Sequence, residues 1–238
     1  MQTMRCMMLV TVLVTAALAH GAEAQTRGGM GRPGMQEERA IRLYGAAGYA
    51  QIDVDELNAR LASLDEPYSP VSEDMIVLGG GLHGRMDRVI LGAEFSLLAS
   101  IEDAEAGDER NAKLSGFQGS GMLGFSILQT DGFDFYPLLQ AGFAAVTLEV
   151  NERGDPTWDD VLGDPGRRST LEAGAFYGAA GVGMDYTFRN GFFMGVRGTY
   201  GFTPKTDSWK EETGEVLGGP EMDLSGPSVR LLLGFGGR

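Results

Sequence analysis

The stretch FFMGVRGTYGF, residues 192–202, decides the fold class, because its side chains sort into two unlike sets. Successive side chains of a β-strand point to opposite faces of the sheet. One set is large and apolar: Phe192, Met194, Val196, Tyr200 and Phe202. The other set is mostly small and includes one arginine: Phe193, Gly195, Arg197, Thr199 and Gly201. The pattern predicts a strand with one apolar face, and the fold class follows from whether that face meets the protein interior or lipid.

Alternation of this kind recurs along the chain and predicts eight strands. We expect them at 40–52, 74–86, 89–102, 113–129, 133–150, 171–188, 191–204 and 225–236. The connections between them alternate in length. Four are long and polar, at 53–73, 103–112, 151–170 and 205–224, whereas the three between these are tight turns with Asp-Gly or Asn-Gly signals in two of them. In an up-and-down antiparallel barrel, this order brings all long loops to one end and all short turns to the other, as in transmembrane barrels.

The charge of the chain follows the same division. The four long connections carry 21 Asp and Glu and 7 Lys and Arg, whereas the rest of the chain carries 12 of each. The net charge of −14 therefore comes from one end of the predicted barrel. An acidic surface repels nucleic acid, which we exclude as a partner. The sequence has neither zinc-ligand spacing nor a phosphate-binding glycine loop, so we expect no metal and no cofactor.

The oily face recurs on other predicted strands, and the opposite face decides its environment. In a water-soluble barrel of lipocalin type the oily face would turn inward, and the outer face would carry Thr, Lys, Glu and Arg. Here the opposite face is largely Gly, Ala and Ser with charges of both signs. Small side chains suit the interior of an eight-stranded barrel, which has room only for packed side chains. The sequence thus predicts an all-β fold, a closed antiparallel up-and-down eight-stranded transmembrane β-barrel, with a soluble periplasmic barrel as the alternative.

The first 24 residues have the features of a secretory signal peptide. Arg5 precedes a short apolar run, and Ala22-Glu23-Ala24 matches a leader-peptidase site. The run is short for a membrane-spanning helix, which needs about 20 residues. The only cysteine, Cys6, would leave with this segment, so the mature chain would contain no disulfide. We expect a signal peptide at 1–24, a flexible segment at 25–39 and the barrel domain at 40–238.

From about residue 40 to the end, the chain resembles the small eight-stranded outer-membrane barrels of Gram-negative bacteria, the OmpA/OmpX type. The resemblance rests on strand pattern and loop asymmetry. It implies a monomer in the cell outer membrane, in contact with lipid and lipopolysaccharide and delivered by the outer-membrane assembly machinery. The long loops would be extracellular, and the short turns and C-terminus periplasmic. Such proteins typically end on an aromatic residue, whereas here Gly236-Gly237-Arg238 follow Phe235.

Aromatic residues gather beside the predicted short turns, where an interfacial girdle at the periplasmic side would lie. They are Phe133, Phe135, Tyr136, Tyr186, Phe188, Phe192 and Phe193.

Charged residues on the inward face are the candidate functional residues. The predicted polar network of the lumen comprises His83, Arg85, Glu94, Asp185, Arg197 and Arg230, with Arg42 and Glu172 as further candidates. Buried charges must be paired. Glu94 is expected to pair with Arg85 beside the 87–88 turn, or across the lumen. The network would act either as a salt-bridged plug or as a gated path for ions or protons, since an eight-stranded lumen is too narrow for an open channel.

No catalytic residue is expected. Lipid-modifying barrels combine a nucleophile, often Ser, with a His base facing the outer leaflet. His83 is the only histidine after the leader, and it is predicted near the periplasmic end on the inward face. The sequence therefore favours a non-enzymatic outer-membrane barrel with a structural or interaction role, displaying acidic extracellular loops. The alternative is a narrow transport or small-ligand-binding barrel.

The first long connection contains a predicted helix. Within 53–67, Val54, Leu57, Leu61 and Leu64 follow a capping-type Asp53 at helical spacing. Their apolar stripe would cover the barrel mouth, packed on the protein's own loops, or meet a partner.

Overall fold

The computed structural model describes residues 39–65, 67–101, 110–151, 168–206, 208–211, 214–216 and 218–236. In these ranges the chain is almost entirely β-structure. The strands are β1 (Arg39–Gln51), β2 (Asp74–Met86), β3 (Val89–Ser100), β4 (Asn111–Phe125), β5 (Leu128–Thr130), β6 (Phe133–Asn151), β7 (Arg168–Thr187), β8 (Phe192–Phe202), β9 (Trp209–Glu211), β10 (Gly214–Val216) and β11 (Gly226–Gly236). One helix, α2 (Asp55–Ala62), lies between β1 and β2. Within the described ranges, no helix has the length and apolar character needed to cross a membrane.

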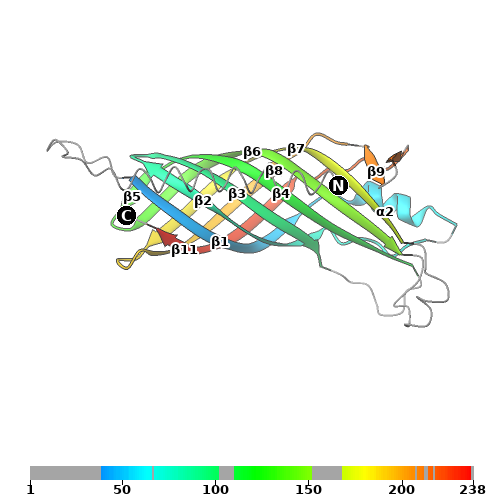
Figure 1. Ribbon diagram of the computed structural model, residues 1–238, viewed down its shortest axis with the longest axis horizontal. Helices are drawn as coiled ribbons and strands as arrows, with labels where there is room; N and C mark the ends of the chain where they lie inside the picture. Colours follow the sequence, from blue (N-terminus) through cyan, green and yellow to red (C-terminus); the bar gives the residue numbers. More distant parts are fainter. Residues whose placement is uncertain are drawn as a thin grey trace. The chain divides into compact units, whose positions relative to one another are not determined.

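Eight of the strands form a closed antiparallel barrel, which confirms the predicted fold class (Figure 1). Each long strand pairs with its neighbours in the order β1, β2, β3, β4, β6, β7, β8, β11, and β11 pairs back to β1. The ring is therefore complete, with Leu43 of β1 opposite Phe235 of β11 and Leu82 of β2. A closed ring pairs the backbone groups of every strand and leaves no edge among these eight.

The short turns lie at one end of the barrel, and α2 and β9 lie at the other (Figure 1). Gly132 and Gly191 have φ angles of 85° and 82° in two of the short turns. This left-handed region is open to glycine because glycine has no Cβ. Asp87 takes a φ of 53° in the third turn, a conformation that Asp tolerates better than most residues.

Two short elements differ from the prediction. The expected strand 113–129 ends at Phe125, and β5 follows as a separate strand on the first residues of β6. The break falls where the Ser126 amide donates to the carbonyl of Arg88 at 2.7 Å, which ties the chain to the neighbouring turn. The last long connection also contains the small hairpin β9–β10, whose strands are only three residues each.

The outer wall of the barrel is apolar, and the assignment of faces made from residues 192–202 is confirmed. Met194 and Leu231 are 41% and 45% exposed, whereas Arg197 and Arg230 are 1% and 4% exposed. Large apolar side chains are exposed on each of the eight barrel strands. Hydrocarbon side chains thus coat the outside, and charged side chains such as Arg197 and Arg230 point inward.

An aromatic cluster marks the outer wall at the short-turn end. Tyr186 contacts Phe188 with ring centroids 4.8 Å apart, Phe188 contacts Phe192 at 5.6 Å, and Phe192 contacts Phe235 at 5.5 Å. Four rings from β7, β8 and β11 and the turn between them form a continuous outward surface. Tyr136 and Phe193, also expected in the girdle, are fully buried instead, so that part of the prediction is wrong. Both fall on the inward parity of their strands.

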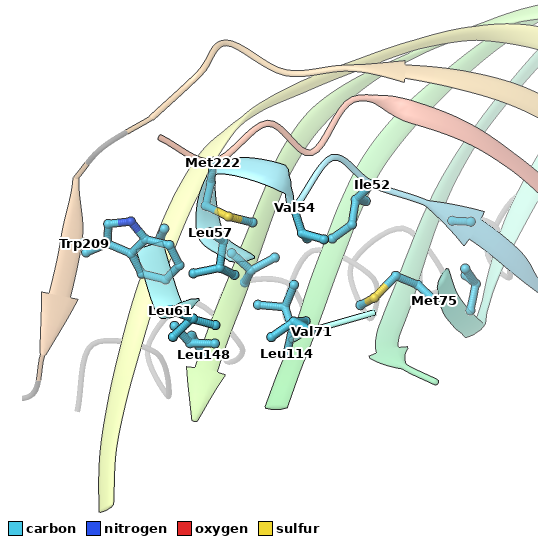
Figure 2. Packing of buried hydrophobic residues seen from close by; sticks show 14 residues of the cluster. Ile52, Val54, Leu57, Leu61, Val71, Met75, Leu114, Leu148, Trp209 and Met222 are labelled. Atoms are coloured by element: carbon cyan, nitrogen blue, oxygen red, sulfur yellow. The ribbon is translucent and has the colours of Figure 1, made fainter. Parts of the chain in front are cut away.

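The opposite end of the barrel is filled by an apolar cap built around α2 (Figure 2). Val54, Leu57 and Leu61 are buried against inward-facing residues of the strands, among them Leu114 and Leu148. The prediction of a helix here is confirmed, and its apolar stripe packs on the protein's own strands. Leu64 lies beyond the helix and is exposed, because α2 ends at Ala62.

Polar contacts hold the cap in place. The Asn58 side-chain amide donates to the carbonyl of Val71 at 2.9 Å, and its oxygen accepts from the Val71 amide at 2.8 Å. These two hydrogen bonds to the backbone fix α2 against the segment that leads into β2. Trp209 of β9 is buried in the same cluster, and its indole N–H donates to the carbonyl of Pro220 at 2.8 Å. The first and last long connections therefore share one apolar core.

The segment before β11 is ordered by Asp223. Its carboxylate accepts from the Ser225 amide at 2.8 Å and from the Thr203 hydroxyl at 3.3 Å. Partial burial acts to raise the pKa of Asp223, but these hydrogen bonds, with Lys205 nearby, lower the pKa below its usual value. The ionised carboxylate thus links the end of β8 to the start of β11.

Candidate functional site: the polar interior

Glu94 of β3 is the centre of the ionic cluster that lies nearer the apolar cap. Its carboxylate forms ion pairs with Arg197 of β8 and Arg230 of β11, from strands on the far side of the ring. It also accepts hydrogen bonds from the Tyr44 hydroxyl at 2.9 Å and the Gln140 amide at 3.2 Å. One carboxylate therefore joins five strands across the lumen.

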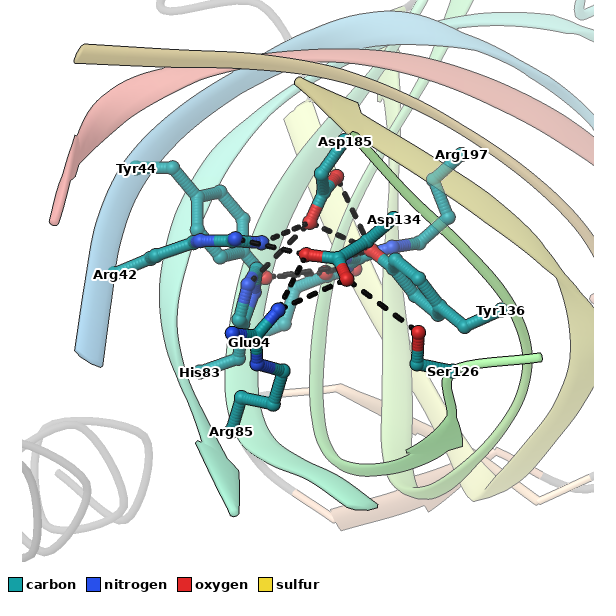
Figure 3. A network of polar contacts seen from close by, with 10 residues as sticks. All are labelled: Arg42, Tyr44, His83, Arg85, Glu94, Ser126, Asp134, Tyr136, Asp185 and Arg197. Carbon is teal, nitrogen blue, oxygen red and sulfur yellow. Dashed lines mark hydrogen bonds and ion pairs between the residues drawn. The ribbon is translucent and has the colours of Figure 1, made fainter. Parts of the chain in front are cut away.

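Asp134 of β6 and Asp185 of β7 form the centre of a second cluster nearer the short-turn end (Figure 3). Arg42 bridges them, with one terminal nitrogen 2.9 Å from Asp134 and the other 3.0 Å from Asp185. Arg85 pairs with Asp134 at 3.0 Å. The Ser126 hydroxyl contributes a longer contact of 3.4 Å to the same carboxylate. A guanidinium that spans two carboxylates in this way uses its planar fork of donors.

Tyr136 connects the two ionic clusters (Figure 3). Its hydroxyl donates to Asp185 at 3.2 Å and accepts from Arg197 at 3.2 Å. Room for this ring comes from Gly183 on the paired strand, where a Cβ would lie 2.4 Å from the ring. Glycine on the inward face is therefore required by the close approach of a neighbouring side chain.

His83 is held as a packed interior residue. Its Nε2 lies 3.4 Å from Asp185, and its ring contacts Tyr44 and Phe193 with centroids 5.5 Å and 5.9 Å apart. The side chain is 1% exposed. A carboxylate and two aromatic rings around a buried imidazole form a structural environment, without the outward access that lipid chemistry would need.

A neutral polar layer separates the ionic clusters from the apolar cap. Arg230 donates to Ser96 at 3.1 Å and to Gln118 at 3.2 Å, and the hydroxyls of Thr199 and Ser228 lie 2.8 Å apart. The interior thus changes along the barrel from ion pairs, through hydroxyls and amides, to hydrocarbon.

The buried charges of the described residues nearly balance. The cations are Arg42, Arg85, Arg197 and Arg230, and the anions are Glu94, Asp134 and Asp185. These arginines outnumber the carboxylates by one, and the additional arginine belongs to the group around Glu94. No set of three or more His, Cys, Asp or Glu side chains in the described ranges could hold a metal ion.

The structure brings all six predicted network residues into the interior. Of the two pairings expected for Glu94, it shows the one across the lumen, with Arg197 and Arg230, whereas Arg85 pairs with Asp134. Arg42 belongs to the network, as considered from the sequence. Glu172 does not, because its side chain is exposed near the cap end of β7, where its backbone pairs with Lys210 of β9.

Three central members were missed from the sequence: Asp134, Tyr44 and Tyr136. Asp134 follows the 130–132 turn by two residues and has the character of a turn residue. Its parity could have identified it, because Leu139 and Phe143 on the same strand point outward, so even-numbered positions there face inward. The same rule places Tyr136 inside.

A closed eight-stranded barrel with a hydrocarbon exterior and an ion-paired interior is the class of protein that these observations define. Its fold is that of the small eight-stranded outer-membrane barrels. No protein-family model matches the sequence, and a comparison with curated proteins gives no match.

Solved structures with a similar fold include three outer-membrane proteins. The attachment invasion locus protein Ail of Yersinia pestis is 12% identical, with 85% of this chain and all of that chain covered, at a TM-score of 0.45. A major outer membrane protein of Thermus thermophilus is 10% identical, with coverage of 84% and 98% and a TM-score of 0.49. The outer membrane protein OprG of Pseudomonas aeruginosa is 12% identical, with coverage of 85% and 96% and a TM-score of 0.43. These likenesses describe the fold.

Proposed function

We propose that this protein is a non-enzymatic outer-membrane barrel with a structural or interaction role, which displays acidic loops outside the cell. The observation that carries the proposal is the reversed distribution of side chains. Apolar residues are exposed on all eight barrel strands, whereas charged residues in the middle of those strands, such as Glu94, Arg197 and Arg230, are buried. Lipid is the solvent that makes this distribution stable.

A soluble barrel is a poor alternative for the same reason. Along β3, the outward residues Leu91, Phe95 and Leu97 are all about half exposed. Soluble monomers rarely expose contiguous apolar patches larger than a few hundred Å². A lipocalin-like barrel would also need an apolar ligand cavity inside, whereas here Glu94 and its arginine partners occupy the middle of the barrel.

The charge of the long connections supports an orientation with these loops outside. They hold the acidic excess of the sequence, and the first and last of them form the apolar cap that closes one end of the barrel. Divalent cations would bridge such a surface to lipopolysaccharide phosphates only weakly. The aromatic cluster around Phe192 would then lie at the periplasmic interface.

The interior argues for a structural role over transport. A solute would have to separate Glu94 from two arginines and then displace the packed helix α2. Separating a buried ion pair leaves an uncompensated charge in a low-dielectric interior, which is strongly unfavourable. A plug that holds opposite walls together is the function that this geometry serves best.

Two experiments test the proposal. Fractionation of cells, with protease shaving of intact cells and heat-modifiable gel migration, should recover a folded barrel in the outer membrane with its long loops accessible. A soluble periplasmic protein would overturn the membrane assignment. Reconstitution into planar bilayers should give no stable conductance, and reproducible conductance steps would overturn the structural role in favour of transport.

A further inference from the structure

A cavity of about 600 Å³ opens at the short-turn end of the barrel, opposite the apolar cap. Its wall combines the end of β2 and the 87–88 turn with the segment from Ser126 to Gly132. Arg42 from β1 and Thr187 from β7 complete it. Small-molecule sites generally have volumes of about 300–1,000 Å³, so this space suits a small ligand.

The wall of this cavity is dominated by guanidinium groups. Arg42, Arg85 and Arg88 line it, and Asp131 is the only acidic residue among the lining residues. The carboxylates that pair with Arg42 and Arg85 do not line the cavity. A ligand in the cavity would therefore face the guanidinium side of two buried arginines that are already ion-paired, together with the exposed Arg88 and Asp131.

Arg42 is fixed at the inner wall of the cavity. Its terminal nitrogens bind Asp134 and Asp185, and the side chain is 3% exposed. Its Nε is buried as well, so Arg42 would act on a ligand through the positive charge of its guanidinium group.

Neutral groups complete the lining. Ser126 and Thr130 provide hydroxyls and Gln129 an amide, all of which hydrogen-bond to oxygen atoms. Ile127 and Leu128 give one wall an apolar character. This combination matches an oxyanion attached to a small organic group.

We propose that the cavity is a binding site for a small organic oxyanion that carries phosphate or carboxylate groups. Arg88 at the exposed mouth would bind the charged oxygens, because guanidinium groups match the geometry of both anions. Arg42 and Arg85 would add positive charge at the buried wall. This site is separate from the Glu94 cluster and lies at the end of the barrel away from the acidic loops.

Calorimetric titration of the full barrel in dodecyl maltoside micelles, a detergent without phosphate, tests the site. Pyrophosphate and citrate are the probes, and uncharged maltose is the negative control. We expect saturable binding of at least one anion and none of maltose. Absence of binding by both anions would overturn the proposal.

Variants assign any binding to the cavity. Arg88→Gln should weaken binding about fivefold, the effect of losing one exposed charge pair. Thr130→Trp should fill the cavity from an exposed position of β5 and remove most binding. The matched control is Arg189→Gln, since Arg189 is an exposed arginine in another short turn at the same end but does not line the cavity. Equal effects of Arg88→Gln and Arg189→Gln would contradict the proposed site.

The same assay distinguishes a lipid headgroup from a soluble anion as the ligand. Phosphatidylglycerol added to the micelles should compete with pyrophosphate if a lipid headgroup reaches the cavity, and phosphatidylcholine serves as the zwitterionic control. Undiminished pyrophosphate affinity in the presence of phosphatidylglycerol would assign the cavity to a soluble anion.

Discussion

Replacement of Glu94 by glutamine should destabilise the barrel more than replacement of either arginine that it binds. Glu94→Gln keeps the size of the side chain but removes the negative charge that Arg197 and Arg230 share. Both guanidinium groups are then buried without a counter-ion from this site. Breaking a buried ion pair by removing one partner typically costs about 3–5 kcal/mol of unfolding free energy, and here two pairs are broken by one change.

Arg230→Gln is the informative comparison. It leaves Glu94 paired with Arg197, and it removes the excess positive charge of this group. The loss is then mainly the hydrogen bonds from Arg230 to Ser96 and Gln118, worth about 1–3 kcal/mol together. We therefore expect Glu94→Gln to lower the free energy of unfolding by roughly 2 kcal/mol more than Arg230→Gln does.

The measurement is the fraction folded against urea concentration, for protein inserted into phospholipid vesicles and assayed by gel mobility without heating. Glu215→Gln is the matched control, because Glu215 lies in β10 and is exposed. An exposed substitution of this kind should change stability by less than about 0.5 kcal/mol. If Glu94→Gln is as mild as Glu215→Gln, the interior charges do not stabilise the barrel, and the reasoning from buried ion pairs is refuted.

Three further predictions concern the cap, the outer wall and the last connection. Leu57→Asp should cost about 2–4 kcal/mol by burying a charge in the apolar cap and should make the first connection sensitive to protease, whereas Leu64→Asp at an exposed position should do neither. Leu231→Arg, halfway along β11, should lower the free energy of urea unfolding from vesicles by about 2–4 kcal/mol. Phe235→Arg, near the strand end, should lower it by only about 0–1 kcal/mol, because the penalty depends on depth in lipid. Equal losses would argue against insertion. The pKa of Asp223 is lowered, so its carboxylate should stabilise the last connection above the usual pKa of an aspartate and lose that effect as the pH falls below about 4. Hydrogen exchange of the Ser225 amide, which is bonded to Asp223, should detect this loss. Asp223→Asn should abolish the pH dependence.

The sequence could predict the barrel because its strands alternate strictly. Outward positions are apolar and inward positions must fit a narrow lumen, so period-2 patterning is strong along β3, β8 and β11. It could also predict α2, whose apolar positions have helical spacing. The hairpin β9–β10 has no comparable signal, because three-residue strands are too short to show a period.

The sequence could not decide between two pairings of the interior charges. Glu94 and Arg85 are near each other along the hairpin of β2 and β3, so a local pair stood beside a pair across the lumen. Side chains inside a narrow barrel, however, meet across the lumen, and their heights depend on the stagger of all eight strands. Glu94 therefore meets Arg197, which is 103 residues away along the chain. Local spacing carries no information about that stagger.

A barrel with an apolar exterior must obtain its internal cohesion differently from a soluble protein. In the proposed membrane setting its outward side chains would contact lipid, so they would contribute little to holding one strand against another. The interior must supply those contacts, and it does so with groups that reach across the ring: Glu94 to β8 and β11, and Arg42 to β6 and β7. Glycines such as Gly183 provide the space for these long side chains. The charges in the lumen are thus most simply understood as cross-braces, and it follows that a ligand would find space at the end of the barrel, beyond the last of them.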